Sequence, residues 1–268
     1  MPASSATLRR DLSQRNFART NECGRELSFG EIPSVIYREE AGRHGNFLPA
    51  SYRSICTNPD WQKRLKKAYT GSKWLPWSDE RKRFELDCAN SSDALLMNIF
   101  CYPRVLCRSQ VCALLSIRPG AAPTFGFKPR IPLLNSQGDQ TEIDMKIDDL
   151  LVEAKLTESG FQSRPSRLLC RYRDIHEVFE FNELPVAGET VRGYQLIRGV
   201  LAAYAAQCSF LLLCDRRRTD LVDGWFDVIR AVRSYCFRNR LKLLTWQEIA
   251  GALPPRLRQF LDQKYGIS

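Results

Sequence analysis

The stretch TEIDMKIDDLLVEAKLTE, residues 141–158, predicts two neighbouring β-strands joined by a tight turn. In its first half, hydrophobic residues alternate with polar ones, which is the period of a half-buried strand: Ile143, Met145 and Ile147 against Glu142, Asp144 and Lys146. Asp148 and Asp149 favour a turn, and the run from Leu150 to Leu156 is apolar except at Glu153 and Lys155. These two charges are separated by one residue, so they point to the same face of the second strand.

The pairing of these strands predicts a metal site. If they pair through the Asp148-Asp149 turn, Asp144 falls nearly opposite Glu153, and both carboxylates can bind one divalent cation. Magnesium suits such a pair because it prefers oxygen ligands, keeps several waters and often takes only one or two protein carboxylates. Lys155 would then polarise a water beside a phosphorus atom. The alternative is a solvated sheet face, since an E-x-K tripeptide also occurs by chance.

The same residues resemble the PD-(D/E)XK, or restriction-endonuclease-like, nuclease superfamily. Asp144 matches the motif aspartate and Glu153-Ala154-Lys155 matches the (D/E)XK tripeptide, although Ile143 stands where the motif has Pro. The resemblance implies an α/β fold, with a central mixed β-sheet flanked by helices in the order αβββαβ. It also implies that Asp144 and Glu153 bind Mg²⁺, with Mn²⁺ as an acceptable substitute, and that Lys155 helps to activate the hydrolytic water.

The flanking sequence predicts the remaining elements of such a core. Ser91 or Ser92 is a plausible N-cap for an apolar helix within Glu85 to Pro103, and a strand broken by prolines is expected within Thr124 to Leu134. The segments that follow the hairpin predict two helices and two strands in alternation: a helix over Glu189 to Gln207, a strand over Ser209 to Cys214, a helix over Asp220 to Arg238 and a strand over Leu241 to Leu244.

Three further residues are candidates for the site through the resemblance. The helix before the first core strand often contributes an acidic residue to the metal, for which Glu85 and Asp93 are the candidates. The Ser-Ser helix start also resembles a family of uncharacterised bacterial restriction-endonuclease-like proteins, which has Gln where this chain has Asp93. Gln195, early in the helix that follows the E-x-K strand, is expected to complete the site. The alternatives are that Asp93 only favours the helix start and that Gln195 is an ordinary helical glutamine.

The charge of the chain predicts a polyanionic partner. Forty Lys and Arg against thirty Asp and Glu give +10, which favours nucleic acid through the release of counterions. The expected phosphate contacts are Lys63, Lys66 and Lys67, in or near a helix that starts near Asn58-Pro59, and Arg164, Arg167 and Arg171 in a later arginine-rich segment. The alternative for the first group is a solvated helix face.

The length and the apolar content predict a globular protein in the cytoplasm. The 268 residues, 44% hydrophobic, contain no apolar run of membrane-spanning length and no signal peptide, and the ten cysteines are expected to be free thiols without an iron–sulfur cluster. We expect residues 1–80 to form a basic, partly ordered N-terminal extension with an amphipathic helix, and residues 81–268 to form the nuclease domain.

These observations together predict a Mg²⁺-dependent DNA endonuclease that serves phage defence, restriction or DNA repair. The alternative is a nucleic-acid-binding module that keeps the fold but does not cleave. The expected partner is DNA, with no membrane, and the chain would act as a homodimer or within a larger defence or repair complex.

Overall fold

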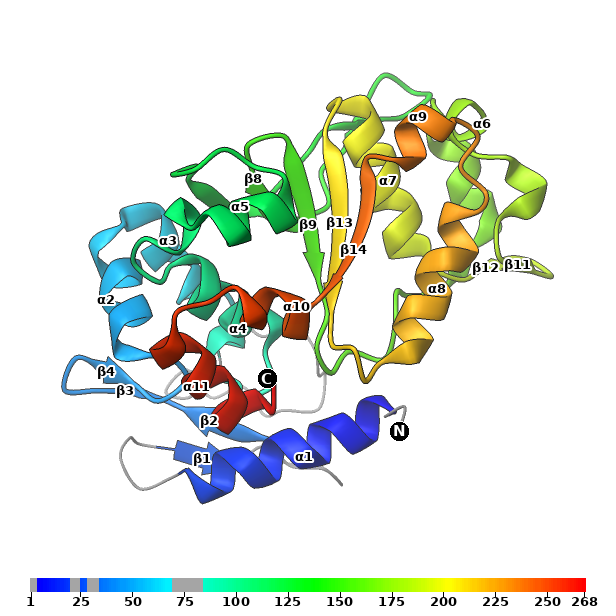
Figure 1. Ribbon diagram of the computed structural model, residues 1–268. Helices are drawn as coiled ribbons and strands as arrows, with labels where there is room; N and C mark the ends of the chain where they lie inside the picture. The colour runs from blue at the N-terminus through cyan, green and yellow to red at the C-terminus, as the bar shows by residue number, and fades with distance from the viewer. Residues whose placement is uncertain (1–3, 20–24, 28–33, 69–83) are drawn as a thin grey trace. The chain divides into compact units, whose positions relative to one another are not determined.

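The computed structural model describes residues 4–19, 25–27, 34–68 and 84–268 (Figure 1). The chain divides into two compact units. We call Ala122–Thr245 the sheet unit, and the described residues of Ala3–Ala121 and Trp246–Ser268 the helical unit. The expected division at residue 80 does not coincide with the boundary between these units and stays a prediction.

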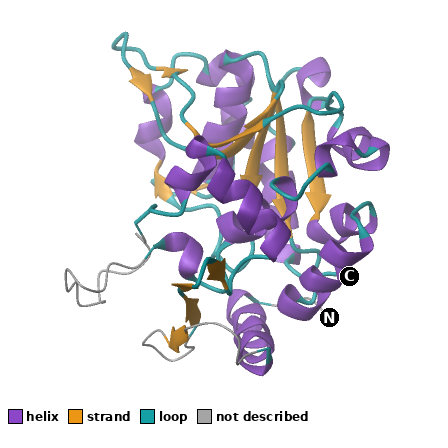
Figure 2. Cartoon of the chain, turned by 90° about the vertical axis from the view of Figure 1, so that its left-hand side faces the viewer, coloured by secondary structure: helices purple, strands orange, loops and turns teal. Residues whose placement is uncertain are grey.

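A five-stranded mixed sheet forms the centre of the sheet unit, with the strand order β14-β13-β9-β8-β5. Its strands in chain order are β5 (Pro123–Phe127), β8 (Ile143–Ile147), β9 (Leu150–Ala154), β13 (Ser209–Cys214) and β14 (Leu241–Thr245). β8 pairs antiparallel with both β5 and β9, whereas β9, β13 and β14 run parallel to one another. Figure 2 shows these strands side by side. The mixed sheet confirms the expected α/β class.

The hairpin of β8 and β9 has the turn that the sequence predicts. Ile147 pairs with Leu150, so that Asp148 and Asp149 alone connect the strands, and Asp148 has a positive φ of 50°. Along β8 the hydrophobic residues are buried and the polar ones are half-buried, as their alternation predicts, whereas every residue of β9 is buried. β9 is a central strand between β8 and β13, which explains its nearly continuous apolar sequence.

Two helices of the sheet unit cover one face of the sheet: α7 (Tyr194–Ala205) and α8 (Thr219–Ile229). Their apolar side chains pack with Phe210 and Leu212 of β13. At Gly199 of α7 a Cβ would lie 2.3 Å from the Phe210 ring, so only glycine allows this close approach. In the register of β9 with β13, Glu153 lies beside Leu212 and therefore points to the face that α7 covers.

The smaller elements of the sheet unit connect these strands and helices. They are β6 (Ile131–Pro132), β7 (Gly138–Asp139), β10 (Arg164–Pro165), η4 (Ser166–Arg171), α6 (Ile175–Val178), η5 (Phe181–Glu183), β11 (Val186–Ala187), β12 (Thr190–Val191) and α9 (Tyr235–Arg238). The helix expected over Asp220 to Arg238 is therefore two helices, α8 and α9, with a break between them.

The helical unit combines helices from both ends of the chain with short strands. Its elements are α1 (Ser5–Ala18), β1 (Arg25–Leu27), β2 (Val35–Tyr37), β3 (Glu39–Glu40), β4 (Arg43–His44), α2 (Pro49–Thr57), α3 (Pro59–Arg64), η2 (Glu85–Asp87), α4 (Ser92–Phe100), η3 (Val105–Cys107), α5 (Ser109–Leu115), α10 (Trp246–Gly251) and α11 (Pro255–Tyr265). Ser91 caps α4 by accepting from the Ala94 N–H, as the sequence predicts.

Residues expected in a partly ordered extension form the regular helix α1, which packs on α11. Leu8, Leu12 and Asn16 are buried and four residues apart, so they lie on one face of the helix. The Asn16 Oδ1 accepts from the fully buried Lys264 Nζ at 2.7 Å. Burial lowers the pKa of Lys264 well below its usual value. This polar contact fixes the first helix of the chain to the last.

Within the described residues, no helix has the length and apolar character needed to cross a membrane. The nine cysteines of the described part of the chain are free thiols, as expected.

Candidate active site

The end of the β8–β9 hairpin places the two motif acids, Asp144 and Glu153, at facing positions. The ladder's last backbone pair is Met145 with Val152, and the next step of that register places Asp144 opposite Glu153. There the ladder gives way to a side-chain contact, because the Asp144 Oδ2 accepts from the Ala154 N–H at 2.7 Å. The expected position of Asp144 opposite Glu153 is therefore the one that the fold produces.

Glu153 is the centre of a buried hydrogen-bonded group. Its Oε1 accepts from the Lys155 Nζ at 2.7 Å and from the Gln195 Nε2 at 2.5 Å. Glu153 is 1% exposed and Lys155 is 6% exposed, so this ion pair is screened from solvent. The structure thus brings together Glu153, Lys155 and Gln195 on the α7 face of the sheet.

The electrostatics of the pair keep the lysine protonated. Burial disfavours the ammonium, but the carboxylates of Glu153, Glu158 and Asp144 outweigh burial and raise the pKa of Lys155 above its usual value. Burial raises the pKa of the Glu153 carboxyl, and Lys155 opposes that shift. Because its proton is held so firmly, Lys155 is suited to donate a hydrogen bond and is a poor base.

Gln195 reaches Glu153 because the start of α7 is fixed to the chain that follows β9. The N–H groups of Tyr194 and Gln195 donate to the carbonyls of Gln162 and Phe161 at 3.1 and 2.9 Å. Gly193 precedes the helix with a φ of 73°, a left-handed conformation that favours glycine. These backbone contacts satisfy two N–H groups of the first turn and direct Gln195 toward the site.

Residues that the sequence analysis did not select surround this centre. Glu158 acts on both Glu153 and Lys155, and its Oε2 accepts from the Leu156 N–H at 2.6 Å. Glu158 lies in the same polar stretch as the motif, which is the signal that could have found it.

Arg198 and Asp139 form a second group next to the site. The Arg198 Nε lies 3.5 Å from the Asp139 Oδ2, and Arg198 also acts on the charge of Glu153. The Tyr172 hydroxyl donates to the same Asp139 Oδ2 at 2.6 Å and lies 3.0 Å from the Tyr194 hydroxyl. Burial raises the pKa of Asp139, but the hydrogen bonds from Thr141 and Tyr172 outweigh it and lower that pKa. No short sequence motif predicts this group, because Asp139 and Arg198 meet only through the fold.

The carboxylates of Asp144 and Glu153 fit a small hard cation. Their donor atoms are oxygens, which Mg²⁺ prefers, and Mg²⁺ completes its shell with water when the protein supplies only one or two carboxylates. In the described residues no group of three or more His, Cys, Asp or Glu side chains is arranged to hold a metal ion. Among the described residues, these two carboxylates are therefore the groups that would hold such an ion.

Glu85 and Asp93, the candidates for an additional metal ligand, lie in an ion-pair cluster of the helical unit. The Asp93 Oδ2 accepts from Arg64 Nη2 at 2.7 Å and from Lys67 Nζ at 2.8 Å. The Lys67 Nζ also lies 3.0 Å from the Glu85 Oε2. Burial and Asp93 raise the pKa of Glu85. Both carboxylates already have cationic partners, and their metal role stays a prediction.

The expected nucleic-acid contacts divide into exposed and engaged side chains. Exposed residues are Lys63, Lys66, Arg164, Arg167 and Arg171. Lys67 is only partly exposed and is held by Asp93 and Glu85, which favours a structural role for it. The helix α3 begins after Asn58 as predicted but ends at Arg64, so Lys66 and Lys67 lie beyond it.

The sheet order, the acidic residue on β8 and the E-x-K tripeptide at the end of β9 define a restriction-endonuclease-like fold. The chain belongs to the family described as "Restriction Endonuclease associating with ARP", whose model matches residues 21–266. No curated protein and no solved structure matches the chain. The family assignment makes this chain a nuclease-like hydrolase.

Proposed function

We propose that the protein is a Mg²⁺-dependent DNA endonuclease whose active centre is formed by Asp144, Glu153, Lys155 and Gln195. The observation that carries the proposal is the convergence of Lys155 Nζ and Gln195 Nε2 on the Glu153 carboxylate, opposite Asp144. An isolated E-x-K tripeptide on a solvated sheet face would be exposed, whereas this one is buried and connected to a second element.

Asp144 and Glu153 are the residues that would hold Mg²⁺. When bound, the ion would supply charge stabilisation to the phosphate and would favour ionisation of a coordinated water. Glu153 is placed for this by Lys155 and Gln195, and Asp144 by the Ala154 N–H.

Lys155 acts in the proposal as a fixed positive charge. Its raised pKa keeps it protonated at neutral pH, so it orients the attacking water or stabilises the charge that develops on the phosphate. Gln195 offers both a donor and an acceptor without adding charge, which suits it to position water or phosphate oxygen.

A plasmid-nicking assay with and without Mg²⁺ tests the proposal. Supercoiled DNA should be nicked when Mg²⁺ is present and not when EDTA is added, and Mn²⁺ should support the reaction too. The Lys155→Ala variant should lose cleavage more than it loses metal affinity in calorimetry. If the protein binds DNA but the plasmid stays intact in every condition, the alternative is favoured: a nucleic-acid-binding module that does not cleave.

Three biological settings fit a DNA endonuclease of this family. Restriction, phage defence and DNA repair all use DNA cleavage in the cytoplasm, and we retain the three as alternatives. The family description names an association with ARP, and we extend that association to this chain. Co-purification of the chain with ARP would support a larger complex, whereas a chain that purifies only with itself would support a homodimer.

A further inference from the structure

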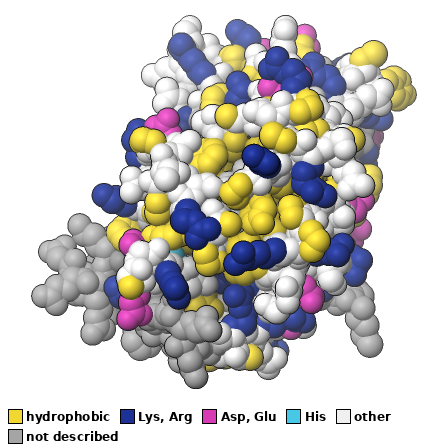
Figure 3. Space-filling view, turned by 60° about the vertical axis from the view of Figure 1, so that its left-hand side comes forward, with side chains coloured by type: hydrophobic (Ala, Val, Ile, Leu, Met, Phe, Trp, Pro, Cys, Tyr) yellow, Lys and Arg dark blue, Asp and Glu magenta, His cyan; other side chains and the backbone are white. Residues whose placement is uncertain are grey.

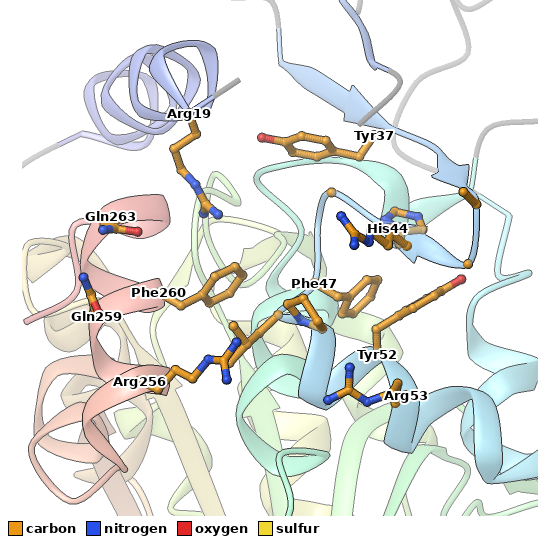
Figure 4. Close-up of a pocket in the computed structure, with 16 residues that line it drawn as sticks. Arg19, Tyr37, His44, Phe47, Tyr52, Arg53, Arg256, Gln259, Phe260 and Gln263 are labelled. Carbon is orange, nitrogen blue, oxygen red and sulfur yellow. The ribbon is translucent and has the colours of Figure 1, made fainter. Parts of the chain in front are cut away.

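A pocket of the helical unit, distant in sequence from the motif residues, has the features of a ligand site. Its volume is 720 Å³, within the range of about 300–1,000 Å³ that is common for small-molecule sites. Figure 4 shows side chains of α1, α2, α11 and the segment around β4 directed into it. We call it the arginine pocket.

The charged groups that line the arginine pocket are basic. In the part of the chain that the structure describes, its lining includes Arg19, Arg43, Arg53 and Arg256 but no Asp or Glu. Within the described part of the chain, none of the four guanidinium groups has an ion pair or a side-chain hydrogen bond. Figure 4 shows Arg19, Arg53 and Arg256 approaching the hollow from three elements. Four positive charges around one pocket favour the binding of an anion. Guanidinium groups suit phosphate because they can donate two parallel hydrogen bonds to its oxygens.

The floor of the pocket is aromatic, which a bare phosphate would not require. Phe47 and Tyr52 stack with ring centroids 5.7 Å apart and an interplanar angle of 27°, and Phe260 lies nearby under Arg19 at 4.8 Å. The Tyr52 hydroxyl is bonded to Glu39 at 2.8 Å, so its polar end is satisfied away from a ligand. Aromatic walls beside arginines are suited to a planar base attached to a phosphate. Figure 3, in which the side of the molecule carrying α2, β3 and β4 comes forward, shows hydrophobic side chains set among Lys and Arg.

One face of α11 supplies groups that can recognise the edge of a base. Arg256, Gln259, Phe260 and Gln263 follow the spacing i, i+3, i+4 and i+7, so they form one stripe of the helix, and all four line the pocket. The glutamine amides each carry two donors and one acceptor oxygen, the kinds of group that pair with base edges. A cationic group, an aromatic ring and amides on one stripe are more than an anion alone would need.

We propose that the arginine pocket binds a nucleoside phosphate, with the arginines on the phosphate and the aromatic rings and glutamines around the base. The ligand is either a free nucleotide or the terminal nucleotide of a nucleic-acid strand, since both present the same chemistry. This site is independent of the cleavage centre, because all its residues belong to the helical unit.

Calorimetry on the full chain in EDTA tests the proposal without cleavage. The titrants are ATP, adenosine, inorganic phosphate, a 5′-phosphorylated single-stranded oligonucleotide and a glutamate-rich peptide. Arg256→Gln should weaken binding at least about tenfold, since it removes a charge-assisted hydrogen bond to the phosphate. Arg258→Gln is the matched control: it removes the same charge from an exposed position of α11 outside the pocket. Its binding should stay within about twofold of wild type if general electrostatics are minor.

Each outcome decides the proposal. Binding of ATP that Arg256→Gln weakens and Arg258→Gln does not would support a free nucleotide. Binding of the oligonucleotide alone, with the same pattern in the variants, would support the end of a strand. Four results would overturn the proposal. Inorganic phosphate binds as tightly as ATP, the peptide binds more tightly than ATP, both variants lose binding equally, or no titrant binds. A thermal melt of both variants checks that these exposed substitutions leave the fold intact.

Discussion

Asp93 and Glu153 are both buried carboxylates that bind a lysine, yet the charges around them are balanced differently. Asp93 pairs with Arg64 and Lys67, and Lys67 also pairs with Glu85. At the other centre, Asp144, Glu153 and Glu158 all act on one ammonium, that of Lys155. Asp93 contacts two cations, whereas Glu153 contacts one, and a divalent cation beside Glu153 would offset the repulsion from the neighbouring carboxylate of Glu158. The number of cations in contact with each carboxylate therefore distinguishes the two clusters, although they are built from the same residue types.

Asp144→Asn should produce the largest effect on cleavage. The substitution removes one metal-binding charge while an amide oxygen can still accept from the Ala154 N–H. Nicking should fall on the order of a thousandfold or more, about 4 kcal/mol of transition-state stabilisation, with the melting temperature nearly unchanged. Asp149→Asn, at the exposed turn of the same hairpin, is the control. If Asp144→Asn nicks DNA at the wild-type rate, the negative charge of Asp144 has no role in catalysis.

Asp93→Ala should affect stability instead of chemistry. It leaves Arg64 and Lys67 without their shared carboxylate in a partly buried cluster, which should cost about 3 kcal/mol in urea unfolding. The exposed pair of Asp60 with Lys63 is the comparison, and Asp60→Ala should cost less than about 1 kcal/mol. Lost nicking by folded Asp93→Ala, with a higher Mg²⁺ requirement, would instead make Asp93 a metal ligand.

Gln195→Ala should give an intermediate loss of activity. It removes one of two donors to Glu153, and alanine is well tolerated inside a helix. Single-turnover nicking should slow about tenfold, which is roughly 1.4 kcal/mol. If the rate is unchanged while the unfolding free energy falls, Gln195 serves only to satisfy the buried Glu153.

The exposed basic residues should have the smallest individual effects, seen in DNA affinity. Lys63→Gln with Lys66→Gln should weaken binding modestly and reduce the slope of log affinity against log salt by about two, as expected for two phosphate contacts. Lys67→Gln should weaken DNA binding much less than the double variant does, because the Lys67 ammonium is held by Asp93 and Glu85. An unchanged salt slope in the double variant would move the DNA track to Arg164, Arg167 and Arg171.

The hairpin and its site could be predicted because their signals are local. Alternation along β8, the Asp148-Asp149 turn and the two charges in an apolar run each lie within a few residues. Gln195 could also be predicted from the sequence, since it lies early in the first long helix after the motif strand.

The remaining features depend on contacts between distant parts of the chain. α1 is largely polar, and only the four-residue spacing of Leu8, Leu12 and Asn16 indicates a buried face; its partner Lys264 lies at the other end of the chain. The arginine pocket likewise joins Arg19 to Arg256. The ion pairs of Asp93 could not be predicted for the same reason, because a sequence does not show which cations reach a carboxylate.

The contact between Asp144 and Ala154 has a consequence for backbone dynamics. The Ala154 amide is bonded to a side chain and not to the opposite strand, so its protection from hydrogen exchange depends on the orientation of Asp144. A ligand that turns Asp144 away would speed exchange at this amide, while the amides of Val152 and Leu150, within the paired part of β9, would keep their protection. A single backbone proton thus becomes a reporter of how the carboxylate is engaged.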